Sequence, residues 1–62
     1  MIQYIESQTI GNTKITLWRV ADYSYQIEIS NNGQKKVLNF AGEYHEAMSE
    51  FILKASEINK MA

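Results

Sequence analysis

The Asn32-Gly33 pair constrains the fold of this 62-residue chain more than any other feature of its sequence. It separates the segment 23–30, which alternates apolar and polar residues without interruption, from a second apolar segment at 34–41. A type I′ turn needs positive φ at both central residues, and Asn-Gly is the pair that adopts this geometry most readily. The pair therefore predicts a β-hairpin with a two-residue turn.

The register of this hairpin predicts one strongly apolar face of a sheet. Ile27 lies opposite Leu38, and Tyr25 lies opposite Phe40, when the turn contains two residues. The alternation of segment 23–30 adds Tyr23 and Ile29 to the same face. A face of this kind must be covered by another element.

The rest of the chain supplies two further strands and one helix. Apolar segments bounded by turn residues predict strands at 2–10, 13–20, 23–30 and 34–41, and a helix is expected at 43–60 after Gly42 as N-cap. The helix has one apolar stripe, made of Tyr44, Ala47, Met48, Phe51, Ala55 and Ile58. We predict an α+β fold: a four-stranded antiparallel β-meander with one C-terminal α-helix packed on one face (β-β-β-β-α). The 62 residues form one small domain, 1–62.

The stretch TLWRV, residues 16–20, divides its apolar residues between the two faces of the sheet. A three-residue turn after Val20 pairs Leu17 with Ile27, so Leu17 faces the helix. Trp18 and Val20 then point away from it. The alternative is that a β-bulge or a different turn brings Trp18 into the core.

Residues of the outer face form the predicted protein interface. A three-residue first loop puts Ile5 on the core side and Ile2, Tyr4 and Ile10 beside Trp18, although a one-residue slip would invert this strand. The predicted apolar band, bordered by Lys14, Glu28 and Lys35, consists of Ile2, Tyr4, Trp18, Val20 and Val37. Contiguous exposed apolar surface usually marks an interface.

The predicted helix also carries an acidic ridge. On a helical wheel its carboxylates gather in one arc, formed by Glu43, Glu46, Glu50 and Glu57. The ridge is a secondary candidate for contact with a basic surface on another protein. The alternative is a solvated helix face with an i,i+4 ion pair between Glu50 and Lys54. Leu53, nearly opposite the apolar stripe, adds an exposed leucine.

Composition excludes several classes of function. The chain has no cysteine and a single histidine, His45, so neither a disulfide framework nor a zinc site is expected, and no other metal or cofactor motif is present. His45 and Glu46 are helix neighbours that face different directions, and no nucleophile motif accompanies them, so we expect no catalytic residues and no enzyme activity. A domain this short gains stability by association, which predicts a homodimer formed through the outer face or an edge strand.

Charge and hydropathy limit the environment and the partners. The net charge of −1 argues against a protein that grips duplex nucleic acid by its phosphates. No apolar run is long enough to cross a bilayer, and no secretory signal precedes the domain, so we expect a cytoplasmic protein with no membrane partner. The absence of proline and the bias toward Ile, Asn, Lys, Glu and Tyr are typical of an AT-rich bacterial or phage genome.

These observations favour a small non-enzymatic module, a regulator or inhibitor from a bacterium or phage, that binds another protein. The alternative is a single-stranded nucleic-acid-binding protein in which bases stack on Tyr4 and Trp18. Its backbone contacts would be Lys14, Arg19, Lys35 and Lys36. The order of four strands and one helix is similar to the dimeric single-stranded-DNA-binding modules of the Whirly and positive-cofactor-four type, a resemblance in element order without a shared motif. A third alternative is a subunit buried permanently in a larger assembly.

Overall fold

The hairpin at Asn32-Gly33 forms as its sequence predicts. Both residues have positive φ, 50° at Asn32 and 84° at Gly33, as a type I′ turn requires. Ile27 pairs with Leu38, and Tyr25 pairs with Phe40. The predicted register of this hairpin is therefore confirmed.

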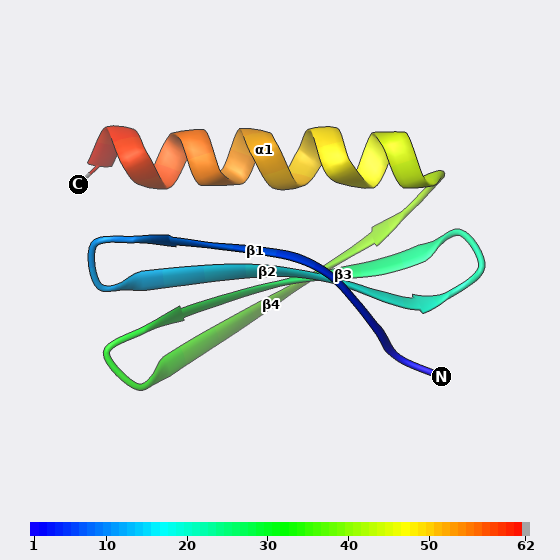
Figure 1. The fold of residues 1–62 in the computed structure, drawn as a ribbon, viewed down its shortest axis with the longest axis horizontal. Coiled ribbons are helices and arrows are strands. Elements are labelled where there is room, and N and C mark those ends of the chain that lie inside the picture. Colours follow the sequence, from blue (N-terminus) through cyan, green and yellow to red (C-terminus); the bar gives the residue numbers. More distant parts are fainter. Residues whose placement is uncertain (62) are drawn as a thin grey trace.

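The computed structural model describes residues 1–61 and has the predicted order of elements. It contains β1 (Gln3–Ile10), β2 (Thr13–Ala21), β3 (Ser24–Asn31), β4 (Gln34–Ala41) and α1 (Tyr44–Met61). The strands form one antiparallel sheet in the order β1-β2-β3-β4. Figure 1 shows α1 along one side of this sheet, where it contacts β1 and β2. The predicted α+β meander with one C-terminal helix is confirmed.

The first two turns differ from the prediction in the same way. Each has two residues instead of three, because Ile10 pairs with Thr13 and Ala21 pairs with Ser24. In each hairpin a β-bulge then shifts the register, between Tyr4 and Glu6 in β1 and between Arg19 and Ala21 in β2. One bulged residue reverses the inward or outward direction of every residue beyond it.

The bulges explain which predicted orientations hold and which do not. Leu17 pairs with Ile27 as predicted, because the bulge after Arg19 supplies the residue that the shorter turn lacks. Ile5 packs against the core, also as predicted. Ile10 was predicted on the outer face, and this is wrong: it lies between the turn and the bulge of β1, and it packs against the core.

The hydrophobic core lies between the inner face of the sheet and α1. Its buried members come from β2, β3 and α1, and they are Ile15, Leu17, Tyr25, Ile27, Ala47, Phe51 and Ala55. Two tyrosines predicted to face this core are exposed instead. Tyr23 is 67% exposed because it lies in the turn between β2 and β3 with φ of 60°, and Tyr44 is 53% exposed at the first position of α1.

Candidate functional site

The outer face of the sheet is centred on a pair of aromatic residues, Tyr4 on β1 and Trp18 on β2. They are directly paired across the two strands, and their ring centroids lie 5.7 Å apart with an angle of 78° between the ring planes. This edge-to-face geometry is favoured by the aromatic quadrupole. Tyr4 is 52% exposed and Trp18 is half-buried, and Trp18 does not belong to the core cluster. The two rings therefore form a defined, solvent-accessible aromatic surface.

Polar contacts fix both rings. The indole Nε1 of Trp18 donates a hydrogen bond of 3.1 Å to Oε1 of Glu28 on the neighbouring strand β3. The other carboxylate oxygen of Glu28 lies 3.1 Å from Nζ of Lys35. On the opposite side, the hydroxyl groups of Tyr4 and Ser7 are 2.7 Å apart and share a hydrogen bond. Held at both ends, the pair has little rotamer freedom left to lose when a partner binds.

The predicted apolar band is interrupted by this polar network. Glu28 on β3 is paired with Thr16 on β2 and with Val37 on β4. Thr16 and Glu28 therefore lie between Val37 and strand β1 on the outer face. Val37 is 46% exposed, but Glu28 separates it from Trp18. The prediction that Glu28 borders the band is therefore wrong, because its side chain divides the band in two.

The other two predicted members flank the aromatic pair differently. Val20 is half-buried at the β-bulge of β2 and does not belong to the core cluster. Ile2 precedes β1 and is 61% exposed. In the described part of the chain no element covers the outer face, since the only helix there lies on the other side (Figure 1). The candidate site is therefore the Tyr4–Trp18 pair with its polar support.

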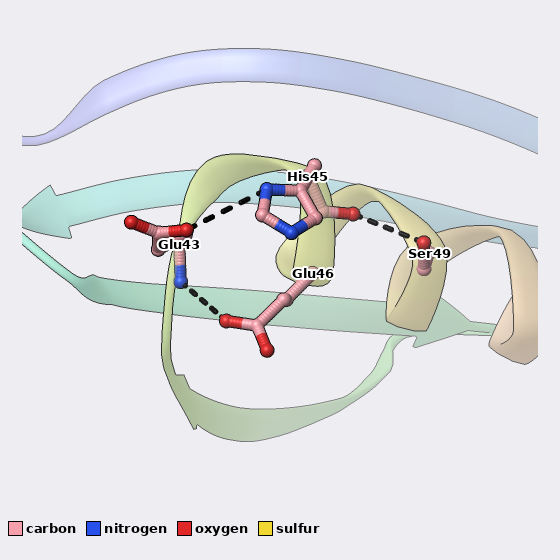
Figure 2. Close-up of polar contacts among 4 residues, drawn as sticks. All are labelled: Glu43, His45, Glu46 and Ser49. Atoms are coloured by element: carbon pink, nitrogen blue, oxygen red, sulfur yellow. Dashed lines mark hydrogen bonds and ion pairs between the residues drawn. The ribbon is translucent and has the colours of Figure 1, made fainter.

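The predicted acidic ridge is largely engaged in the structure of the helix itself. Figure 2 shows that Oε1 of Glu46 accepts a hydrogen bond of 2.9 Å from the backbone N–H of Glu43. Glu46 thus provides half of a capping box, and the N-cap residue is Glu43 instead of the predicted Gly42. The carboxylate of Glu43 lies 3.8 Å from Nδ1 of His45.

Farther along the helix the ion pair also differs from the prediction. Lys54 contacts Glu57, three residues on, at 3.7 Å instead of Glu50. Glu50 itself is half-buried. Leu53 is 51% exposed, as predicted for a residue opposite the core stripe. Three members of the ridge, Glu43, Glu46 and Glu57, thus have contacts within this chain, so a binding partner is not needed to explain them.

Sequence reasoning missed a pocket of about 520 Å³ at the end of the sheet. It lies where the turn between β2 and β3 meets the start of α1, and it is lined by Arg19, Asp22, Tyr23, Tyr25, Glu43, Tyr44 and His45. Its charged groups are already paired, since the guanidinium of Arg19 contacts Asp22 at 2.8 Å. Tyr23, one of its lining residues, has positive φ, a conformation that is rare for tyrosine and that its sequence does not signal.

Among residues 1–61, no group of three or more metal-ligating side chains is close enough to hold a metal ion. Within the same residues, no helix is both long and apolar enough to span a membrane.

Comparison with known proteins gives no match: no family model, no curated protein and no solved structure matches this chain. A proposal for function therefore rests on the geometry and chemistry of the surface.

Proposed function

We propose that this chain is a small non-enzymatic protein-interaction module, a regulator or inhibitor that acts by binding another protein through the outer face of its sheet. One observation carries the proposal: Tyr4 and Trp18 are held in a fixed edge-to-face pair on a face that α1 does not cover. Tyrosine and tryptophan are the residues most enriched among those that dominate binding energy. Their fixed geometry lowers the entropy cost of association.

The charges around the pair support a protein partner over single-stranded nucleic acid. Arg19, one of the expected phosphate contacts, pairs with the buried Tyr25 and so belongs to the inner face, where it contacts Asp22. Lys35 is on the outer face, but its charge is offset by Glu28 at 3.1 Å. Nucleic-acid binding needs uncompensated positive charge along the path of the backbone. A mixed-charge border with an aromatic centre is the usual composition of a protein interface.

The partner is expected to present an apolar pocket or ridge with a polar rim. Its apolar part meets the accessible surface of Tyr4 and Trp18, and its rim meets the Glu28–Lys35 pair. The proposal includes a cytoplasmic location, which the absence of cysteine in the sequence supports.

The test uses affinity capture from cells followed by binding measurements on the purified partner. Trp18→Ala is expected to weaken binding by about 30-fold or more, because truncating an interface tryptophan typically costs about 2 kcal/mol or more. Leu53→Ala is the control, since Leu53 is an exposed apolar residue that lies on the helix, away from the outer face. It should leave the affinity within about twofold of the parent value.

Circular dichroism and thermal unfolding of both variants establish that each one is folded before binding is compared. If Trp18→Ala and the parent protein retain the same partners with equal affinity, the outer face is not the binding surface and the proposal is wrong.

A further inference from the structure

The edge of the sheet at β4 presents a regular row of unpaired backbone groups. Asn31 and Gln34 close a two-residue hairpin and therefore form a hydrogen-bonded pair. Just beyond the other end of the strand, the N–H of Gly42 donates to the carbonyl oxygen of Tyr23 at 3.0 Å. Both hydrogen-bonded positions, 34 and 42, are even-numbered. The even-numbered residues of β4 thus bond to β3. The outward N–H and C=O groups belong to Lys35, Val37, Asn39 and Ala41.

The opposite edge, at β1, has two features that hinder pairing with another strand and that β4 lacks. A bulge at Ile5 breaks the row of outward groups, and the N–H of Ser7 is bonded at 3.1 Å by the side chain of Glu6. Bulges and local capping of this kind protect an edge from pairing with another strand. β4, in contrast, pairs with β3 without any register shift along its whole length. Within residues 1–61, no side chain hydrogen-bonds to its outward backbone groups.

We propose that β4 pairs antiparallel with β4 of a second copy of this chain, joining the two sheets into one. A two-fold axis at Leu38 gives the register in which all four outward-directed residues of β4 have partners. In this register Val37 faces Asn39 of the second copy, and these outward-directed residues exchange both backbone hydrogen bonds. α1 leaves the edge accessible, because it lies over β1 and β2 (Figure 1).

Charge complementarity favours this register over one centred on Lys36. Lys36 lies on the inner face, paired with Ile29, and in the proposed dimer it lies opposite Phe40 of the second copy. The Phe40 ring and Oε1 of Glu46 both lie next to Gly42. If Gly42 carried a β carbon, that atom would be 2.9 Å from each of them. The ammonium group of Lys36 can therefore reach a carboxylate and an aromatic ring of the second copy. A dimer centred on Lys36 would instead place two ammonium groups against each other.

The lysines of β4 do not block this pairing. Lysine prevents an edge strand from pairing with another strand when pairing would place its charge against apolar surface or against another lysine. Lys35 already has its partner, Glu28, on the outer face, and it lies opposite Ala41 of the second copy. Lys36 gains a partner when the dimer forms. The residues that follow, from Val37 to Ala41, carry no charge.

The first test measures the dimer dissociation constant by sedimentation velocity on the full chain and two edge variants. Val37→Pro removes an outward N–H of β4 without removing a bond to β3, and it should weaken the dimer by about 100-fold. Thr9→Pro removes an outward N–H at the β1 edge and serves as the matched control, expected within about twofold of the parent. A chain that stays monomeric up to about 1 mM, or a dimer indifferent to Val37→Pro, overturns the proposal.

Two further measurements keep the proposal testable if the proline variant does not fold. Lys36→Glu should weaken the dimer by about tenfold, whereas Lys14→Glu, the same charge change away from β4, should not. Amide exchange measured by NMR should show concentration-dependent protection at the odd-numbered residues of β4 from 35 to 41, and none should appear at Ser7 or Thr9. Equal protection at both edges, or equal effects of the two charge changes, contradicts β4 pairing.

The dimer is independent of the proposed outer-face site. Trp18→Ala should leave the dissociation constant of the dimer unchanged, so failure of one proposal is distinguishable from failure of the other. A dimer that Trp18→Ala dissociates would be formed by the outer face, and β4 pairing would then be wrong.

Discussion

Leu17 and Trp18 are neighbours on β2, yet they belong to two faces of the sheet that are organised differently. Leu17 has no exposed surface and lies in an aliphatic and aromatic core under α1. Trp18 is held by one ring contact and one hydrogen bond on the face that α1 does not cover. The inner face is stabilised by non-directional burial, whereas the outer face is ordered by directional contacts. Stability and the proposed binding surface can therefore be altered separately in this chain.

The largest effect on stability is expected for Leu17→Ala. Truncating a fully buried leucine typically lowers the free energy of unfolding by about 2–5 kcal/mol, and a domain of this size has only roughly 3–9 kcal/mol in total. Urea denaturation followed by circular dichroism should show a variant that is largely unfolded or close to it. Leu53→Ala is the control, with an expected change within about 0.5 kcal/mol. Similar losses in the two variants would mean that Leu17 does not anchor the core.

An intermediate effect is expected for the aromatic pair of the outer face. A double-mutant cycle with Tyr4→Leu and Trp18→Leu should give a coupling energy of about 0.5–1.5 kcal/mol, the usual value for an edge-to-face pair. Trp18→Phe keeps a ring at this position but loses the hydrogen bond to Glu28, which separates the two contributions. A coupling energy of zero would show that the two rings do not support each other in solution.

The smallest effect is expected for Glu28→Gln. The amide oxygen can still accept the indole N–H, so the change removes only the ion pair with Lys35, whose side chain is 61% exposed. Glu28 is less exposed, at 25%, but the ammonium group is open to water and salt, so the pair is expected to contribute about 0–1 kcal/mol. Unfolding measured at low and at high salt should show a difference that disappears at high salt. A loss that persists at high salt would mean that the carboxylate has a structural role beyond the ion pair.

Much of the fold could be predicted because turn chemistry fixes strand register. The Asn32-Gly33 pair determines the whole β3–β4 ladder, including the cross-strand pairs Ile27–Leu38 and Tyr25–Phe40. The helix was predictable for a similar reason, since its apolar residues recur every three or four positions. Both signals are local: one follows from the backbone preferences of two residues, and the other recurs along the helix.

The two β-bulges could not be predicted, because each is a single extra residue without a composition of its own. Ile5 and Val20 are ordinary strand residues, and only the packing of the folded sheet identifies them as the bulged positions. Ile10 was predicted on the wrong face because the bulge at Ile5 was not foreseen. Tyr23 is similar, since an Asp-Tyr turn gives no warning that a tyrosine adopts positive φ.

The interruption of the apolar band could have been predicted from the sequence. Glu28 is opposite Val37 through one hairpin register and opposite Thr16 through the other, and both registers were predicted correctly in that region. Combining them places Glu28 in the middle of the band. The hydrogen bond to Trp18 depends on rotamers and required the structure.

The helix is joined to β4 but packs on β1 and β2, and this has a consequence for the order of folding. Each hairpin can close as soon as its two strands have been synthesised, because its contacts are local. The inner face stays open until the 18 residues of α1 have emerged and crossed back to the start of the sheet. Until then, Ile15, Leu17 and Ile27 remain accessible to chaperones and to other chains. α1, which is made after the strands that it covers, is thus the element that ends the vulnerable period of this sheet.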